Sequence, residues 1–214
     1  MSIHHPRTWE GRAFLATSLD GYVARRNHDL AWLTDPPPSA GHVEPQPSDA
    51  VPSYDEHLAG VDHVLMGRGT YEVVRRFDEW PYPDHQVLVL SHTLNHGDDR
   101  ITVVRSTSEA VRTLTDRDSQ AVYVDGAGVV SDWLARGLID DLVLTRAPVV
   151  LGDGIALFGP VRDDLRFVHL GTSWNEHGYL TTHYRVVHPE PRTRRRPKPT
   201  QTPAPTPTPA PSDG

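Results

Sequence analysis

Short apolar runs alternate with helix-like segments along most of this chain, and that alternation limits the folds it can adopt. The strand-like runs span residues 12–17, 63–66, 86–90, 101–104, 121–124 and 141–150, followed by a turn-linked pair at 166–172 and 179–187. Helical segments at 53–60, 70–77, 108–114 and 129–136 separate them. Strands joined through helices run parallel, so the pattern predicts an α/β fold: three layers, with a mostly parallel central sheet, helices on both faces and an antiparallel C-terminal hairpin at one edge.

The two ends of the chain differ in composition from the body. Residues 189–214 hold nine of the twenty prolines and no Val, Ile, Leu, Phe, Trp or Tyr. Such a segment buries too little apolar surface to offset the entropy of ordering. We therefore expect a flexible N-terminus over 1–9, one domain over 10–188, and a disordered Pro/Thr-rich tail with a basic run over 189–214.

Charge and residue usage exclude several classes of function. The net charge is −7 for the whole chain, and because the tail contributes +3, residues 1–188 carry −10. A body this acidic offers no basic face for nucleic acid. The absence of cysteine excludes disulfides and thiolate metal sites, and the thirteen histidines show no metal-ligand spacing. No apolar run is long enough to span a membrane and no signal peptide is visible, so we expect a cytoplasmic protein without a metal.

Two glycine-containing turns follow predicted strands and open predicted helices. The first is Gly67-Arg68-Gly69-Thr70, and the second is Gly126-Ala127-Gly128-Val129. Glycine lets the backbone approach a ligand closely, and the helix N-terminus behind it favours a phosphate. Each turn alone also fits an ordinary structural turn. The longer glycine fingerprint of the Rossmann fold, with its acidic residue on the next strand, is absent, which favours another nucleotide-binding architecture.

A third segment, Ser18-Leu19-Asp20-Gly21-Tyr22-Val23-Ala24, follows the first predicted strand and precedes Asp29-Leu30-Ala31-Trp32-Leu33. Asp-Gly is a common turn pair, so Asp20 fits either a structural turn or a pocket at the end of the strand. Residues 35–52 then hold six prolines in eighteen residues. A loop of this length inside a compact domain is commonly functional or disordered, and it could form a substrate lid or a pocket wall.

Taken in order, SLDGYVA, DLAWL, YDEHLAGVDHVLMGRGTYE, VLVLSHT, VYVDGAG and LARGLIDDLVLTRAPVVLGDGIALF resemble the reductase domain of the riboflavin-pathway deaminase-reductases. The resemblance spans about residues 10–186, is closer still to stand-alone proteins of that family, and is shared more distantly with dihydrofolate reductase. It implies a dihydrofolate-reductase-like fold, a homodimer, and an NADPH-dependent reductase of a heterocyclic substrate. The substrate would be related to 5-amino-6-(5-phosphoribosylamino)uracil. The deaminase part, with its zinc-binding cysteines, is missing.

The resemblance also assigns cofactor-binding positions. Gly67, Arg68 and Thr70 match the segment that holds the adenosine-side phosphates of NADPH. Leu90, Ser91 and His92 match the strand end beside the adenine and the 2′-phosphate. Gly126, Ala127, Gly128 and Val129 match the turn on the pyrophosphate, and Ala16, Val23 and Ala24 match positions that line the nicotinamide. Val129 replaces a residue that is often basic in dihydrofolate reductases, so preference for NADPH over NADH would depend on Arg68 and His92.

The same resemblance places Asp20, Trp32 and Asp55 toward the substrate, with Ser18 beside Asp20. We expect Asp20, and second Asp55, to contact the substrate or relay the proton that accompanies the hydride. Asp55 also fits the first turn of a capped helix, where an acidic residue is favoured by the dipole alone. Trp32 fits the core equally well. Two alternatives stay open: a dihydrofolate (pterin) reductase, or a non-catalytic nucleotide-binding module.

Overall fold

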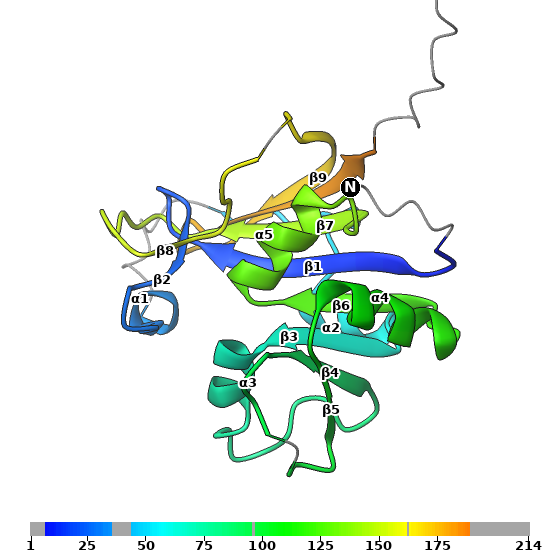
Figure 1. Cartoon of the computed structure of the whole chain (residues 1–214). Helices are drawn as coiled ribbons and strands as arrows, with labels where there is room; N and C mark the ends of the chain where they lie inside the picture. The colour runs from blue at the N-terminus through cyan, green and yellow to red at the C-terminus, as the bar shows by residue number, and fades with distance from the viewer. Residues whose placement is uncertain (1–6, 36–43, 96, 162, 189–214) are drawn as a thin grey trace, which may run out of the picture.

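A computed structural model of the chain describes residues 7–35, 44–95, 97–161 and 163–188 (Figure 1). The predicted disorder of the tail over 189–214 concerns residues outside those ranges. Within the ranges, no helix is both long and apolar enough to cross a membrane.

An eight-stranded sheet forms the centre of the molecule, in the order β5-β4-β3-β6-β1-β7-β10-β9 (Figure 1). Its strands are β1 (Glu10–Thr17), β3 (His63–Gly67), β4 (Gln86–Leu90), β5 (Ile101–Val104), β6 (Ala121–Asp125), β7 (Asp141–Arg146), β9 (Arg166–Trp174) and β10 (Leu180–Val187). The six strands from β5 to β7 run parallel, and β10 and β9 add antiparallel at one edge. This confirms the predicted α/β, dihydrofolate-reductase-like architecture.

Helices cover both faces of the parallel strands, because successive side chains on a strand point to opposite faces. On β3, Val64 and Met66 pack with helices α2 (Tyr54–Ala59) and α3 (Arg68–Val74), whereas Leu65 packs on the other face. That second face carries α4 (Thr107–Asp116) and α5 (Ala127–Ala135) (Figure 1). The capping box predicted at α2 is present.

The chain leaves two neighbouring strands in opposite directions. From β3 it passes to α3 on one face of the sheet, and from β6 it passes to α5 on the other. The two connections therefore diverge at the carboxyl ends of the strands and leave a crevice between them. In open α/β sheets, such a switch point is where ligands bind.

Some predicted boundaries differ from the structure. The strand predicted over 141–150 ends at Arg146, because the chain turns at Pro148, which has no N–H for the ladder, and the Val149 N–H bonds to the Ala147 carbonyl. The helix predicted over 70–77 begins earlier, at Arg68, and ends at Val74. A short helix α1 (Ala31–Thr34) and a two-stranded sheet of β2 (Tyr22–Ala24) and β8 (Ile155–Ala156) were not predicted.

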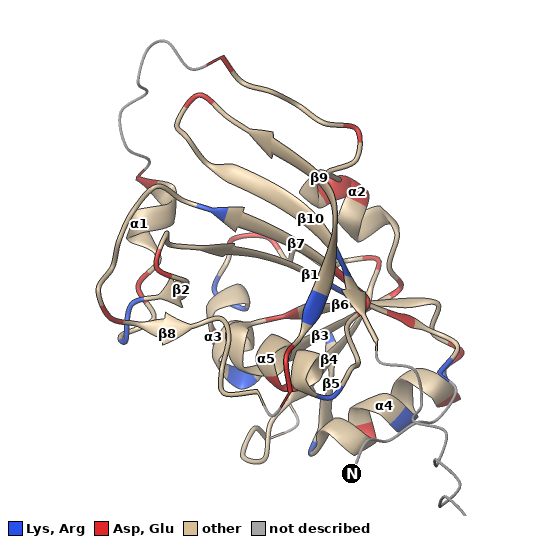
Figure 2. Cartoon of the chain, turned by 90° about the horizontal axis from the view of Figure 1, so that it is seen from above, with Lys and Arg blue, Asp and Glu red and all other residues tan. Residues whose placement is uncertain are grey.

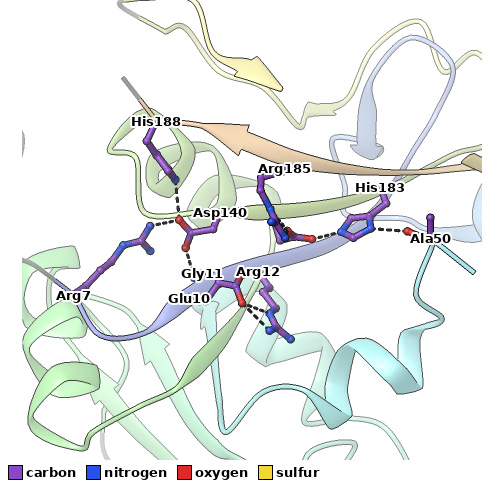
Figure 3. Close-up of polar contacts among 10 residues, drawn as sticks. Arg7, Glu10, Gly11, Arg12, Ala50, Asp140, His183, Arg185 and His188 are labelled. Carbon is purple, nitrogen blue, oxygen red and sulfur yellow. Dashed lines mark hydrogen bonds and ion pairs between the residues drawn. The ribbon is translucent and has the colours of Figure 1, made fainter. Parts of the chain in front are cut away.

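The last three residues of the predicted flexible N-terminus are packed against the domain, which corrects that boundary. Trp9 is buried, and its ring lies 5.6 Å from the Trp133 ring on α5. The Arg7 guanidinium donates to the Leu138 carbonyl. It also donates to the Asp140 carboxylate (Figure 3). Trp9 and Arg7 therefore attach residues 7–9 to the domain, although the composition of this segment predicted a flexible chain end. Residues 1–6 lie outside the described ranges.

The described part of the proline-rich loop does not cover the crevice. Gln46 pairs with Trp174 at the end of β9. His183 on β10 places its Nδ1 2.7 Å from the Ala50 carbonyl oxygen and contacts Asp141 through its other nitrogen (Figure 3). Residues 44–52 therefore run along the antiparallel strands, which corrects the expectation of a lid for this half. The other half, residues 36–43, is outside the described residues.

Candidate active site

A cleft of about 620 Å³ opens at the carboxyl ends of the central parallel strands. Its walls come from the ends of β1, β3, β4 and β6, from α3 and α5, and from the small β2–β8 sheet. The lining residues are Phe14, Leu15, Ala16, Val23, Ala24, His28, Leu30, Leu33, Tyr54, Gly67, Gly69, Thr70, Val73, Val74, Phe77, Tyr82, Leu90, Asp125, Gly126, Ala127, Gly128, Val129, Asp132 and Ile155.

One part of the cleft, which we call the glycine end, consists of Gly67, Gly126, Ala127 and Gly128. Gly126 has φ +86°, and a Cβ on it would overlap the Thr70 hydroxyl, so the two turns predicted from sequence meet here. Gly126 is also the N-cap of α5 and supplies no capping side chain. A Cβ on Gly128 would meet no protein atom within 4 Å. The first turn of α5 thus presents backbone N–H groups to open space, which suits an anion.

Arg68 stands beside the cleft and is absent from its lining. Its guanidinium donates to the Thr93 hydroxyl at 2.8 Å and lies 3.4 Å from the Glu72 carboxylate. The side chain is exposed, so it bridges the start of α3 to the loop after β4. It can turn toward a ligand lying across the end of β4 only by loosening these contacts.

The three residues predicted to lie beside the adenine, Leu90, Ser91 and His92, differ in whether they reach the cleft. Leu90 lines the cleft. The Ser91 hydroxyl instead accepts the N–H groups of Thr93 and Leu94 and shapes the turn that follows. His92 is exposed and does not line the cleft.

The small β2–β8 sheet forms the wall opposite α3. Ala16 at the end of β1 and Val23 and Ala24 on β2 line the cleft, and the nicotinamide contact that the resemblance assigns to them stays a prediction. Ile155 on β8 joins them, and sequence analysis missed it because a two-residue strand leaves no periodic pattern. His28, also missed, holds a left-handed backbone with φ 65° and places its ring 3.9 Å from the Cβ position of Gly69.

Asp20 and Ser18 hold this wall in place. The Asp20 carboxylate accepts the Ser18 hydroxyl and the N–H groups of Leu151 and Gly152. These hydrogen bonds, the Ser18 one first, lower the pKa of Asp20 to about 2. The carboxylate is therefore ionised near neutral pH and carries no proton to donate. It ties the turn before β2 to the segment leading to β8, a positioning contact; its predicted contact with substrate stays a prediction.

Trp32 and Asp55, also predicted to face the substrate, do not line the cleft. Trp32 is buried in a separate apolar cluster with Ala147 and Tyr179. Asp55 is exposed in the first turn of α2, where an acidic side chain favours the helix dipole. Residues close to them in sequence line the cleft instead. These are Leu30 and Leu33, on either side of Trp32 in the sequence, and Tyr54, which precedes Asp55.

A second part of the cleft, which we call the tyrosine end, is made of side chains and adjoins the glycine end at Asp125 and Gly126. It consists of Phe14 on β1, Tyr54 on α2, Val73 and Phe77 in and after α3, Tyr82 before β4, and Asp125 at the end of β6. The Tyr54 and Tyr82 hydroxyl oxygens lie 3.5 Å apart, and the Phe14 and Tyr54 rings pack edge to face at 5.5 Å.

Asp125 is the acidic group of the tyrosine end. It shares a face of β6 with Tyr123, two residues earlier, whose hydroxyl donates to the Phe14 carbonyl. The Asp125 carboxylate accepts the Gly126 N–H at 2.7 Å. Burial nevertheless raises the pKa of Asp125 to about 6, and burial also raises the pKa values of Tyr54, Tyr82 and Tyr123. Asp125 therefore titrates near neutral pH, as a proton donor must.

Sequence analysis missed Asp125, although a signal was present. The residue directly precedes the glycine turn and ends an apolar strand, so it stands where the crevice of a parallel sheet opens. Its partners Tyr54 and Tyr82 are far away in sequence, which hid the cluster. In the described part of the chain no group of three or more His, Asp or Glu side chains could hold a metal ion. The chemistry available is proton transfer beside a backbone-lined anion site.

Comparisons with known proteins agree on one family. Residues 11–176 match the RibD C-terminal domain. The uncharacterized protein YwjB of Bacillus subtilis is 28% identical over 163 residues, which cover 74% of this chain and 88% of YwjB. A putative riboflavin biosynthesis protein from Shewanella sp. PV-4 is 30% identical with a TM-score of 0.71, covering 84% of this chain and 99% of that one. Dihydrofolate reductase from Enterococcus faecalis, 14% identical with a TM-score of 0.54, shares the fold over 84% of this chain and 98% of its own.

Proposed function

This chain belongs to the RibD C-terminal domain family, and on that premise we propose that it is a reductase that uses NADPH to reduce a small ring compound. The observation that carries the proposal is a single cleft with an uncapped helix N-terminus at its glycine end and a half-buried carboxyl of raised pKa at its tyrosine end. A nucleotide-binding module without catalysis would have no use for the second feature. The reaction type resembles that of 5-amino-6-(5-phosphoribosylamino)uracil reductases.

The glycine end fits a dinucleotide. Ala127 and Gly128 would hold the pyrophosphate with their N–H groups, since the space a Gly128 Cβ would fill is open to a ligand. Ala16, Val23 and Ala24 would flank the nicotinamide with small apolar surfaces. When bound, the cofactor supplies a hydride to an electron-poor carbon.

Asp125 would supply the proton. Reduction of a C=N or C=O bond adds two electrons and a hydrogen to carbon, and the heteroatom needs a proton at the same time. The Asp125 carboxyl is protonated in an appreciable fraction of molecules near pH 6, whereas Asp20 at the other wall is not. After turnover the carboxylate takes its proton back from solvent. Tyr54 and Tyr82 would orient the heteroatom through their hydroxyls.

A titration of the purified full-length chain with NADPH and with NADH, followed by nicotinamide fluorescence, tests the proposal. We expect NADPH to bind with a Kd in the micromolar range. Failure of both nucleotides to bind below millimolar concentration would overturn it.

Substitution of Arg68 tests the choice between the two nucleotides. Arg68→Ala should weaken NADPH several-fold more than NADH, because its guanidinium lies between the start of α3 and the loop after β4, where the resemblance places the 2′-phosphate. Arg117→Ala, an exposed arginine bonded to Gln86 at the opposite end of β4, is the matched control. Equal losses for the two nucleotides in Arg68→Ala would remove Arg68 from this role.

A further inference from the structure

We infer that the compound reduced at the tyrosine end is a flat, uncharged ring that carries no phosphate or carboxylate. The inference rests on the proposed reductase function and narrows its substrate. It separates this chain from both candidates suggested by resemblance, since a phosphoribosylamino-pyrimidine and dihydrofolate each carry an anionic group. Three observations support it: the described cleft wall holds no Lys or Arg, the nearby arginines are engaged or lie outside that wall, and its exposed apolar surface matches a neutral ring.

The cleft wall contains no Lys or Arg among the described residues. Besides the two tyrosines, its ionisable members are Asp125, Asp132 and His28. An anion moved from water into an apolar cleft loses its hydration, and only cationic or N–H donors compensate for that loss. The body of the chain around the cleft is also acidic.

The arginines in the turn after β2 already have acidic partners. Arg25 lies 3.4 Å from the Asp29 carboxylate, and Arg26 pairs with Asp153. These are the basic residues that follow the SLDGYVA motif, so they were the natural candidates for a phosphate. Both are exposed on the outer side of β2 and neither contributes to the cleft wall.

The arginines around α3 and β7 are also outside the cleft wall. Arg75 stacks over the Tyr71 ring at 6.0 Å. Arg76 and Arg146 are exposed, and neither lines the cleft. Figure 2 shows where the charged residues lie along the ribbon, mainly in the helices, in the connections and near strand ends.

The tyrosine end instead exposes apolar surface. Four of the eleven exposed large hydrophobic side chains described for this chain line the cleft: Leu30, Tyr54, Val73 and Phe77. Phe77 is 55% exposed, which is unusual for a phenylalanine without a partner surface. Apolar side chains gathered in a concavity with a few polar groups are typical of sites for small apolar ligands. A bound ring would cover these side chains, and the two phenol hydroxyls would bond its carbonyl or ring nitrogen.

Pairs of compounds that differ only in a phosphate test the inference directly. Riboflavin and its 5′-phosphate form one pair, and 5-amino-6-ribosylaminouracil and its 5′-phosphate form the other. Binding would be measured by flavin fluorescence or calorimetry, and turnover by NADPH oxidation at 340 nm. We expect the uncharged member of each pair to bind at least tenfold more tightly and to have the higher kcat/KM. Equal or tighter binding of the phosphorylated members overturns the inference, and so does failure of both uncharged members to bind.

A variant that supplies the missing cation gives a second test. Val73→Arg should reduce the preference for the uncharged member of each pair at least several-fold, because it places a guanidinium in the wall of the tyrosine end. If the Val73→Arg protein unfolds at a lower temperature than the natural chain, Phe77→Arg replaces it in the test. Val187→Arg is the matched control and should leave the preference unchanged, because Val187 ends β10 outside the cleft and its exposed fraction lies between those of Val73 and Phe77. An unchanged preference in both cleft variants contradicts the inference.

Nucleotide binding measured on the same samples keeps the two proposals apart. If NADPH does not bind, the reductase function fails, whatever the ring compounds do. If NADPH binds and the phosphorylated members are preferred, only the substrate class is wrong.

Discussion

The glycine end of the cleft is built from backbone, whereas the tyrosine end is built from side chains. At the glycine end, the absence of a side chain is what counts. Gly126 has a left-handed φ and no room for a Cβ, and Gly128 leaves the space beside it open. At the tyrosine end, Phe14, Tyr82 and Asp125 matter for the groups they carry. A backbone site binds what many nucleotides share, and a side-chain site selects one compound. We therefore expect substitutions at the two ends to separate cofactor binding from chemistry.

The largest effect should follow from Asp125→Asn at the tyrosine end. The amide keeps the size of the carboxyl but cannot deliver a proton, so turnover should fall by about 10²–10⁴-fold. NADPH affinity should change less than about threefold, because the glycine end is intact. Steady-state kinetics and nicotinamide fluorescence measure the two quantities. Asp20→Asn is the comparison variant. If turnover falls further in Asp20→Asn than in Asp125→Asn, Asp20 and not Asp125 is the proton donor.

Gly126→Ala should produce the converse result at the glycine end. The new Cβ meets the Thr70 hydroxyl in a left-handed backbone, so the turn must shift. We expect about 1–3 kcal/mol of lost stability and NADPH affinity reduced about tenfold or more. Gly97→Ala, where a Cβ meets no atom within 4 Å, is the control for thermal unfolding. Unchanged nucleotide affinity in a folded Gly126→Ala protein would show that the turn does not carry the pyrophosphate.

The pH dependence of turnover should report Asp125 alone. Because its pKa is about 6, the protonated acid is lost as pH rises, and kcat/KM should fall about tenfold per pH unit above that value. The stability of the folded chain should depend on pH in the same direction as turnover. A carboxyl whose folded pKa is raised above 3.8 favours the folded state at low pH, and that contribution disappears as pH rises through 6.

Asp125→Asn gives the control for both measurements. It should be more stable than the natural chain at pH 8, with the difference vanishing below pH 4. A turnover profile that is flat between pH 5 and pH 8 in the natural chain would contradict protonation of Asp125.

The smallest effect should come from Asp20→Ala, which loosens the wall shared by the two ends. Loss of the bonds to Leu151 and Gly152 frees the segment leading to β8, so KM for both cofactor and ring substrate should rise a few-fold. Because Asp20 is exposed, the loss of stability should be small. A selective loss of kcat with unchanged KM would instead support the direct catalytic role predicted from sequence.

The sequence alone predicted the main parallel strands, the four helices between them and the two glycine turns. The hydrophobic pattern is local, so short apolar runs separated by helical segments indicate parallel strands joined through helices. A glycine turn is also a local signal, which is why Gly67, Gly126 and Gly128 were identified before the fold was known. Trp9 and the small β2–β8 sheet escaped prediction, since their partners are distant in sequence.

Only the tertiary structure decided the tyrosine end. Phe14, Tyr54, Tyr82 and Asp125 come from four separate segments, and no spacing links them in sequence. Their meeting follows from the sheet order β4-β3-β6-β1, which brings segments distant in sequence to one crevice. Trp32 instead packs with Ala147 and Tyr179, and Asp20 bonds to the segment that leads to β8. Backbone conformation can be foreseen from single residues, whereas the pKa of Asp125 depends on burial that exists only after folding.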